Sequence, residues 1–233
     1  MSNTLENIIL SLQHTQNMQK HIAENNLTTH IRHLQAWQTK RLLVTHDDLW
    51  QSKRFKPAMQ FFIDELYGPK DFSQRDNELA RVVPKMAKLL PDKALLSLQA
   101  ALKLNALSLE LDLSLIQDLG KNTLDHNSYF ASYKACNNQT KREEQIQLLE
   151  NLGLDLAQVV KISGISAILM LSRKPAKVAG VKSLHEFLEK GFKSFKKLGN
   201  VHDFINPIIL KERKMMLALF ENDENDNPLP KVN

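Results

Sequence analysis

The sequence predicts an all-α fold, a single domain built as an irregular bundle of about eight to ten helices. Leucine dominates the apolar residues and the 233 residues include only seven glycines, which favours helices over strands. Apolar residues also recur at helical spacing along most of the chain. A chain of this length, with 42% hydrophobic and 24% charged residues, can bury one sizeable core. We expect the domain to span residues 1–220, followed by a disordered, acidic and amide-rich tail at residues 221–233.

The first three helices follow from apolar spacing and from helix start and stop signals. Residues 4–24 predict a polar, moderately amphipathic first helix, and a second helix runs from Leu27 to about Lys53. The buried stripe of the second helix consists of Leu27, Ile31, Leu34, Leu42 and Leu49. Pro57 fits the first turn of a third helix, because the N–H that proline lacks would be unsatisfied there. Gly68, followed by a proline, ends the third helix in the usual position after its last turn.

A fourth helix begins at residue 73. Ser73 and Asp76 resemble a capping box, with Asp in place of the preferred Glu. Pro84 in the interior of this helix would cost about 3 kcal/mol, so we expect a kink or a break near Val82 and Val83. Such a kink would open the bundle beside it and leave room for a ligand.

The longest element is predicted from Asp92 to about Leu119. Leucines alternate between Leu107 and Leu115 as they would in a strand, but the length of the whole segment decides for a helix. Apolar residues also recur every seven positions. A coiled coil needs a second set of apolar positions in each heptad, and here that set contains Asn105 and Asp112. A helix inside the bundle is therefore favoured over a coiled-coil dimer.

The C-terminal half predicts further helices. Five are expected. The first spans residues 122–135, the second begins with a capping box at 140–143 and ends at residue 151, and the third spans 152–172. The fourth begins with a cap at residue 183, and the fifth spans 205–220 with Pro207 near its start. Residues 152–172 are apolar almost all round, so we expect them to form the central buried helix. The core should therefore be built around residues 92–119 and 152–172.

The common catalytic motifs are absent from the sequence. A phosphate cradle needs closely spaced glycines, and the closest pair here, Gly191 and Gly199, is eight residues apart. A nucleophile elbow fails at Gly164, because Ser166 is not followed by the required glycine and lies in a helical pattern. Cys136 has no recognisable histidine partner. A non-enzymatic protein without a cofactor is therefore favoured.

Histidines gather in the first two predicted helices. A helical metal-dependent enzyme would use some of His14, His21, His30, His33, Glu24 and Glu65. Helical di-iron sites need Glu-x-x-His pairs, and none occurs in this chain. The sequence therefore favours solvent-facing or hydrogen-bonded histidines and no metal site, and the metalloenzyme is kept as the alternative.

Basic residues concentrate near the predicted helix that begins at residue 183. The candidates for binding an anionic surface are Lys190, Lys193, Lys196 and Lys197. With a net charge of +5, an adaptor for anionic surfaces, including peripheral contact with a membrane, is a second alternative. Aromatic residues are too sparse in this region to stack bases, so a nucleic-acid partner is disfavoured. The favoured interpretation is a core-packed helix with a solvated basic face.

The segment from Phe61 to Asp76 is the most informative part of the chain. Its candidate ligand-binding residues are Phe61, Phe62, Glu65, Tyr67, Asp71 and Arg75. In one interpretation Arg75 pairs with Asp71 or Glu65 in a packed turn that holds two helices at an angle. In the other, these groups line the mouth of a pocket where Arg75 holds a carboxylate or a phosphate. The architectural interpretation is favoured, because turns between helices often use such pairs.

This segment resembles a family of uncharacterised bacterial proteins. The resemblance is carried by Phe61, Phe62, Leu66, Tyr67, Gly68, Pro69, Asp71, Phe72, Arg75 and Asp76. It extends from about Leu34 to Leu119. The resemblance implies a helical cytoplasmic protein of bacteria and brings no known activity.

Together these observations predict a helical binding or interaction protein. Its ligand would be an unknown small molecule of apolar or anionic, acyl-like character, or a partner helix, held near the Phe61 to Asp76 segment. The N-terminus carries no basic region before its short apolar run, so no secretory signal is expected. No apolar stretch approaches about 20 residues, so no transmembrane segment is expected either. These features and the single cysteine predict a cytoplasmic protein.

Overall fold

A computed structural model describes residues 3–69, 72–86, 92–223 and 226–232. The helices are α1 (Asn3–Glu24), α2 (Thr28–Thr45), α3 (Asp47–Gln51), α4 (Lys56–Phe62), the π-helix η1 (Ile63–Tyr67), α5 (Ser73–Met86), α6 (Asp92–Leu119), α7 (His126–Ala135), α8 (Gln139–Val159), α9 (Ile165–Leu171), α10 (Arg173–Val178), α11 (Lys182–Lys196) and α12 (His202–Glu221). All regular structure in these residues is helical, which confirms the predicted all-α class. The described residues form slightly more helices than predicted, because short helices such as α3, α9 and α10 interrupt the longer patterns.

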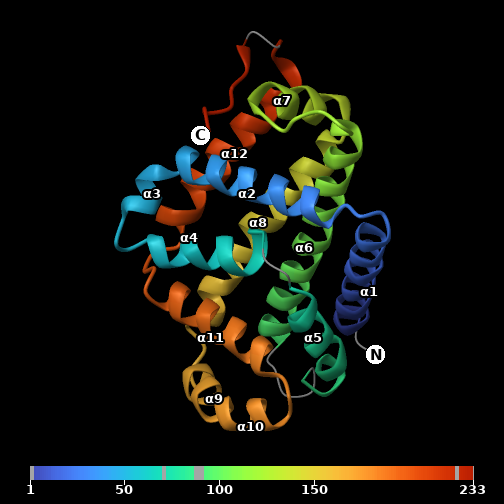
Figure 1. Ribbon diagram of the computed structural model, residues 1–233. Helices are drawn as coiled ribbons and strands as arrows, with labels where there is room; N and C mark the ends of the chain where they lie inside the picture. The colour runs from blue at the N-terminus through green and yellow to red at the C-terminus, as the bar shows by residue number, and fades with distance from the viewer. Residues whose placement is uncertain (1–2, 70–71, 87–91, 224–225, 233) are drawn as a thin grey trace.

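Helix α6 is the central element of an elongated bundle (Figure 1). It packs most extensively against α1 on one side and α8 on the other, and α8 in turn packs against α12. Within the described residues one helix, α6, is long and apolar enough to cross a membrane. The prediction that no apolar stretch approaches this length did not identify it. Half of its most apolar 18-residue window is buried inside the bundle, as in the core helix of a globular protein.

The prediction for α6 agrees with the structure, but the prediction of a second central helix at residues 152–172 is wrong. The chain leaves α8 after Val159, and Gly164 has a φ of 89°, which favours glycine and ends the continuous helical path. Helix α9 then lies at the lower end of the molecule, beside α10 (Figure 1). Only one face of α9 is buried there, so its apolar composition does not make it a core helix.

Helix α4 begins with Pro57 in its first turn, as predicted, and continues into the π-helix η1. Gly68 ends η1 by donating its N–H to the carbonyl of Ile63 at 2.7 Å. Its φ of −78° is not left-handed, so glycine is not needed here for a positive φ, as it often is after the last turn of a helix. A Cβ atom at residue 68 would lie 2.4 Å from the Ile63 carbonyl oxygen, and this close approach requires glycine.

Helix α5 runs from Ser73 through Val82 and Val83 to Met86, so the predicted break at those two residues does not occur. Asp71 and the side chains of Tyr67, Ser73 and Pro84 lie outside the described part of the structure. The pairing of Arg75 with Asp71, the Tyr67 hydroxyl contact and the Ser73 cap therefore stay predictions.

Several predicted helix starts differ from the structure. Helix α7 begins at His126 rather than at 122, and α12 begins at His202 rather than at 205. Helix α8 follows Asn138, so residue 140 lies inside the helix. Helix α11 follows Val181. The backbone N–H of Leu184, in its first turn, donates to the carboxylate of Glu78 from α5 at 3.0 Å. A distant carboxylate thus takes the role that the sequence assigned to a local serine.

The chain after α12 folds back on α7. Leu229 is buried, and His126 at the start of α7 donates from Nε2 to its carbonyl oxygen at 2.7 Å. Asn227 also donates to the carbonyl of His126 at 3.0 Å. Within the range 221–233, where a disordered tail was predicted, the described Leu229 is therefore packed, because it finds an apolar site that composition alone does not reveal.

Candidate functional site

The segment around η1 lies where three hollows of the molecule meet, and Leu66 borders all three. We name them by a characteristic element or residue. The α9 cavity, of about 110 Å³, lies on the α9 and α11 side. The His46 cavity, of about 100 Å³, lies toward α12. The Asp112 hollow, of about 220 Å³, lies between α1, α2 and α6.

The α9 cavity is almost entirely apolar. Its lining includes Phe61 from α4, Leu98 and Ala101 from α6, Leu152 and Leu156 from α8, Ile165 and Leu169 from α9, and Phe187 and Leu188 from α11. Among the described residues that line it, Ser97 alone has a polar side chain, and its hydroxyl already donates to the carbonyl of Lys93. A cavity with such a lining is suited to an apolar group.

Phe61 and Phe62, both predicted as ligand-binding residues, face different cavities. Phe61 is buried, lines the α9 cavity and packs on the ring of Phe187 at 5.6 Å between centroids. Phe62 lines the His46 cavity and stacks on Phe204 at 6.2 Å. Gly191 allows α11 to approach Phe61, because a Cβ atom there would lie 2.9 Å from the Phe61 ring.

Arg75 lies in a packed turn, with 6% of its surface exposed. Its guanidinium donates to the backbone carbonyl of Glu65 and, at 3.0 and 3.1 Å, to one carboxylate oxygen of Asp76. The rings of Phe72 and Phe187 lie against it, at 4.3 and 4.9 Å from their centroids. These contacts engage the guanidinium within the protein, as in the architectural interpretation, with Asp76 as the carboxylate partner.

Glu65 and the predicted basic residues of α11 are also engaged with neighbouring groups. Lys190 donates to the buried Glu65 carboxylate at 2.7 Å, and this bond raises the pKa of Lys190. Lys193 pairs with Glu189 at 2.7 Å, and Lys196 lies over the ring of Phe192. Lys197 is exposed just after the end of α11.

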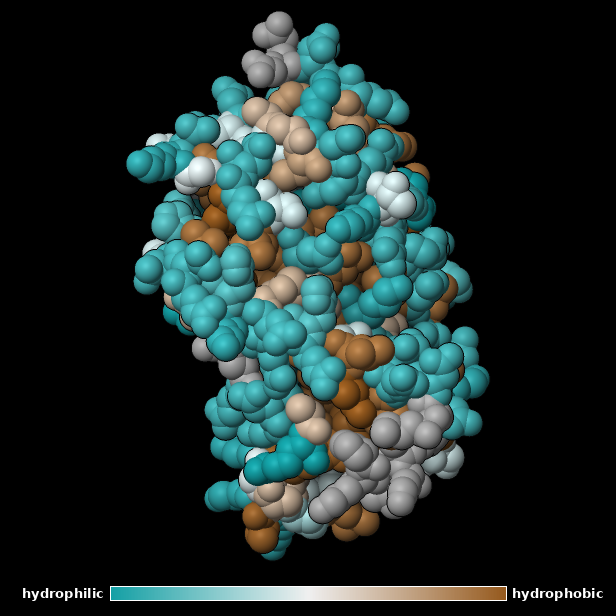
Figure 2. All heavy atoms as spheres, turned by 90° about the vertical axis from the view of Figure 1, so that its right-hand side faces the viewer, coloured by the Kyte–Doolittle hydropathy of each residue, from teal (hydrophilic) through white to brown (hydrophobic). Residues whose placement is uncertain are grey.

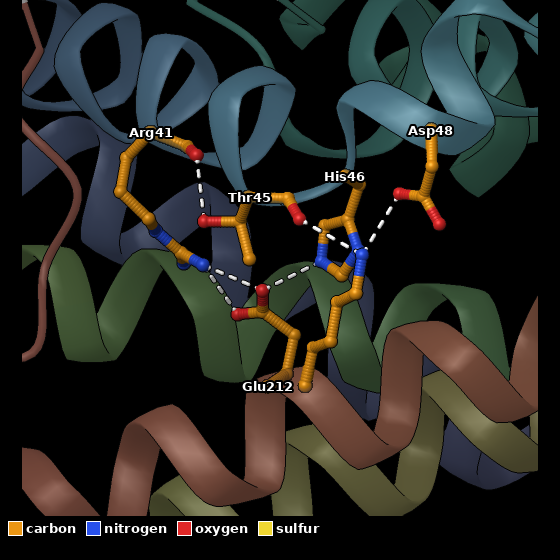
Figure 3. Close-up of polar contacts among 6 residues, drawn as sticks. Arg41, Thr45, His46, Asp48 and Glu212 are labelled. Carbon is orange, nitrogen blue, oxygen red and sulfur yellow. Dashed lines mark hydrogen bonds and ion pairs between the residues drawn. The ribbon is translucent and has the colours of Figure 1, made fainter.

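The strongest buried charge cluster was not predicted from the sequence. Arg41 from α2 donates to both oxygens of Glu212 from α12 at 2.6 Å, and His46 donates to one of them at 2.8 Å (Figure 3). Burial alone would raise the pKa of Glu212, but the charge of Arg41 and the contact with His46 lower it to about 2. Glu212 is therefore an anion held between two donors.

A second layer of bonds fixes this cluster. Lys211, next to Glu212 on α12, donates to the Thr45 carbonyl at 3.2 Å and to the Asp48 carboxylate at 2.8 Å (Figure 3). The Thr45 hydroxyl donates to the Arg41 carbonyl at 2.9 Å. The junction between α2 and α3 is thereby attached to α12 and forms one wall of the His46 cavity.

Asp112 is a further buried carboxylate. It accepts hydrogen bonds from Gln35 at 3.1 Å and Gln38 at 3.0 Å, both from α2. Burial raises the pKa of Asp112, and these two bonds only partly oppose it. An Asp inside a leucine-rich helix was the sequence signal for this contact, whereas Glu212 lies in a charged stretch and gave no comparable signal.

The structure does not gather the histidines of the metal-dependent alternative. His30 and His33 are exposed, His14 lies 3.8 Å from Glu110, and His21 contacts Asn25. Across the part of the chain that the structure describes, no group of three or more His, Cys, Asp or Glu side chains could hold a metal ion.

Comparison with known proteins assigns a family. No curated protein and no solved structure matches the chain. A family model matches residues 17–226, which extends beyond the residues 34–119 covered by the sequence resemblance and includes the C-terminal half. The α9 cavity, the Arg75 turn and the Glu212 cluster all lie inside the matched range. The chain therefore belongs to the family described as Domain of unknown function (DUF8198).

Proposed function

We propose that this protein is a binding protein that holds a small apolar group, such as a short alkyl chain or a ring, in the α9 cavity. The observation that carries the proposal is the lining of this cavity, which is apolar apart from one serine that is already hydrogen-bonded. A buried apolar surface without an occupant forgoes dispersion contacts, which a ligand of matching size restores.

The volume and the walls of the cavity define the ligand class. At about 110 Å³ it is comparable to engineered cavities of about 150 Å³ that bind benzene. Leu66 separates it from the His46 cavity, so a longer chain would require Leu66 to change its rotamer. Because basic residues are concentrated on α10 and α11, an anionic head group at the surface is favoured over a cationic one.

Helix α9 is the wall through which a ligand would enter. It is only seven residues long and follows Gly164, whose left-handed backbone forms a turn rather than a continuous helix. Its inner residues Ile165 and Leu169 line the cavity. The Leu169 carbonyl accepts from His185 Nε2 at 2.8 Å and from the Ser172 hydroxyl at 3.3 Å, and these bonds fix the end of the wall.

The test is calorimetric titration of the purified protein with hexanoate, octanoate and dodecanoate. We expect octanoate to bind and to raise the melting temperature, because a ligand that binds only the folded state stabilises it. Ala101→Leu places three additional carbon atoms in the cavity and should abolish binding. Val160→Phe, at the end of α8, fills the same cavity with a larger side chain from a different wall.

The matched control is Ala131→Leu on α7, which adds the same atoms at an exposed position. It should leave octanoate binding unchanged. The proposal fails if none of the acids binds the wild-type protein, or if both filling variants fold and still bind octanoate with wild-type affinity.

A further inference from the structure

We infer that the α9–α10 segment, residues 160–181, is a docking surface for an anionic lipid bilayer. This surface is distinct from the α9 cavity, although α9 contributes its inner face to the cavity and its outer face to the surface. It is also distinct from the lysines of α11, which are largely engaged with Glu65, Glu189 and Phe192.

The first observation is a concentration of positive charge. Residues 156–185 contain no Asp or Glu, but they contain Lys161, Arg173, Lys174, Lys177 and Lys182. Arg173 and Lys182 are paired with Glu189 and Glu186 of α11, so the positive charge of this surface comes mainly from the other three lysines. Lys161, Lys174 and Lys177 are exposed. Arg81 of α5 adds a further exposed cation, because it donates to the carbonyls of Ala179 and Gly180 at 3.2 and 2.7 Å. An anionic surface attracts such a cluster, and salt weakens the attraction.

The second observation is the unusual exposure of large apolar side chains in the same segment. Ile168, Met170 and Leu171 are 55%, 60% and 71% exposed, and Val178 is 90% exposed. In the chain as a whole, scattered exposed leucines are ordinary, but here four such residues lie within eleven positions. Apolar side chains between lysines are the pattern of segments that insert shallowly at a lipid interface.

The position of the segment in the molecule permits such contact. Helices α9 and α10 form the lower end of the bundle in Figure 1, away from α7 and the C-terminus. Figure 2 shows apolar side chains at this end, and apolar side chains also lie among polar ones higher on the same face. A flat bilayer could meet this end without contacting the rest of the protein.

The experiment is flotation of the full-length protein with phosphatidylcholine vesicles, with and without phosphatidylglycerol, at low and at high salt. We expect binding to the vesicles that contain phosphatidylglycerol and loss of that binding at high salt. Lys174→Glu with Lys177→Glu should weaken binding by at least about 25-fold, since each lysine near an anionic surface contributes about fivefold. Leu171→Ser should weaken it about tenfold through lost apolar burial.

Matched controls come from α12. Leu210 is 72% exposed, nearly the same as Leu171, and Lys214 is also exposed. Leu210→Ser and Lys214→Glu should therefore bind like the wild type. All of these positions are at the surface, and circular dichroism should show unchanged helix content.

Three outcomes would overturn the inference. The first is no binding, or equal binding to both kinds of vesicle. The second is an equal loss in the control and the test variants. In the third, the wild-type protein binds no vesicles but forms a dimer in sedimentation experiments, and Leu171→Ser abolishes the dimer. The apolar patch would then be an interface between proteins. Failure of octanoate binding would not affect this result, because vesicle binding depends on the outer face of the segment.

Discussion

Removing the charge of Glu212 should destabilise the protein by about 3 kcal/mol. The ordinary pKa of this carboxyl is 4.5 and that in the folded protein is about 2. At about 1.36 kcal/mol for each pH unit, this difference corresponds to about 3 kcal/mol. Glu212→Gln keeps the shape of the side chain but removes the carboxylate charge that faces the Arg41 guanidinium, whose side chain is 8% exposed. Breaking one side of a buried pair in this way costs about 3 to 5 kcal/mol.

Urea denaturation at a series of pH values tests the reasoning. A carboxyl whose pKa is lowered by folding contributes stability above its ordinary pKa, and that stability is lost as the pH falls through the folded value. The wild-type protein should therefore lose the Glu212 contribution between about pH 4.5 and 2. Other carboxylates, such as Glu189 with its pKa of about 2 beside Arg173 and Lys193, titrate in the same range. The difference between wild type and Glu212→Gln removes their contribution and should vanish toward pH 2.

Two further variants complete this test. Glu186→Gln disrupts a 3.5 Å pair with Lys182 in which both side chains are more than half exposed, so its effect should be at most about 0.5 kcal/mol. Arg41→Met with Glu212→Leu replaces the buried charges by apolar groups and should recover much of the stability. The reasoning is refuted if Glu212→Gln lies within about 1 kcal/mol of the wild type at pH 7, or if its stability falls with pH as steeply as that of the wild type.

Two other substitutions test the segment around η1. Leu66→Ala removes the side chain that separates the three hollows, so we expect a loss of about 2 to 5 kcal/mol in urea denaturation and faster exchange of octanoate in NMR titrations. Gly68→Ala places a Cβ atom 2.4 Å from the Ile63 carbonyl and should cost about 1 to 3 kcal/mol, measured in the same way; a neutral effect would mean that η1 relaxes without strain.

The sequence predicted the elements whose signals are local and strong. Helix α6 has the predicted bounds, because 28 consecutive residues with helical apolar spacing contain no proline or glycine. Helix α1 agrees within one residue at its start. Helix α4 starts around Pro57 as predicted, since proline restricts the backbone directly.

The errors arose where a local signal had to be weighed against contacts elsewhere in the chain. Residues 152–172 are apolar, but their position at the end of the bundle leaves part of that surface exposed. Helix α5 continues through Val82 and Val83 to Met86, so Pro84 did not break it there. The N-terminus of α11 is satisfied by Glu78, which lies more than 100 residues earlier.

Part of the candidate site was predicted from the sequence and part was not. Sequence reasoning identified the segment from Phe61 to Asp76 as distinctive, and the structure places three hollows around it. It did not identify the cluster of Arg41, His46 and Glu212, because Glu212 is more than 160 residues from the other two in sequence.

The sequence by itself determined the all-helical class, the central role of α6 and the helix end at Gly68. These follow from backbone preferences and apolar periodicity, which act over a few neighbouring residues. Only the tertiary structure decided which carboxylates are buried with partners, where the α9 cavity lies, and which apolar residues of α9 and α10 stay exposed. Those outcomes depend on which helix faces meet, and the free energy of burying a side chain depends on its neighbours in space rather than in sequence.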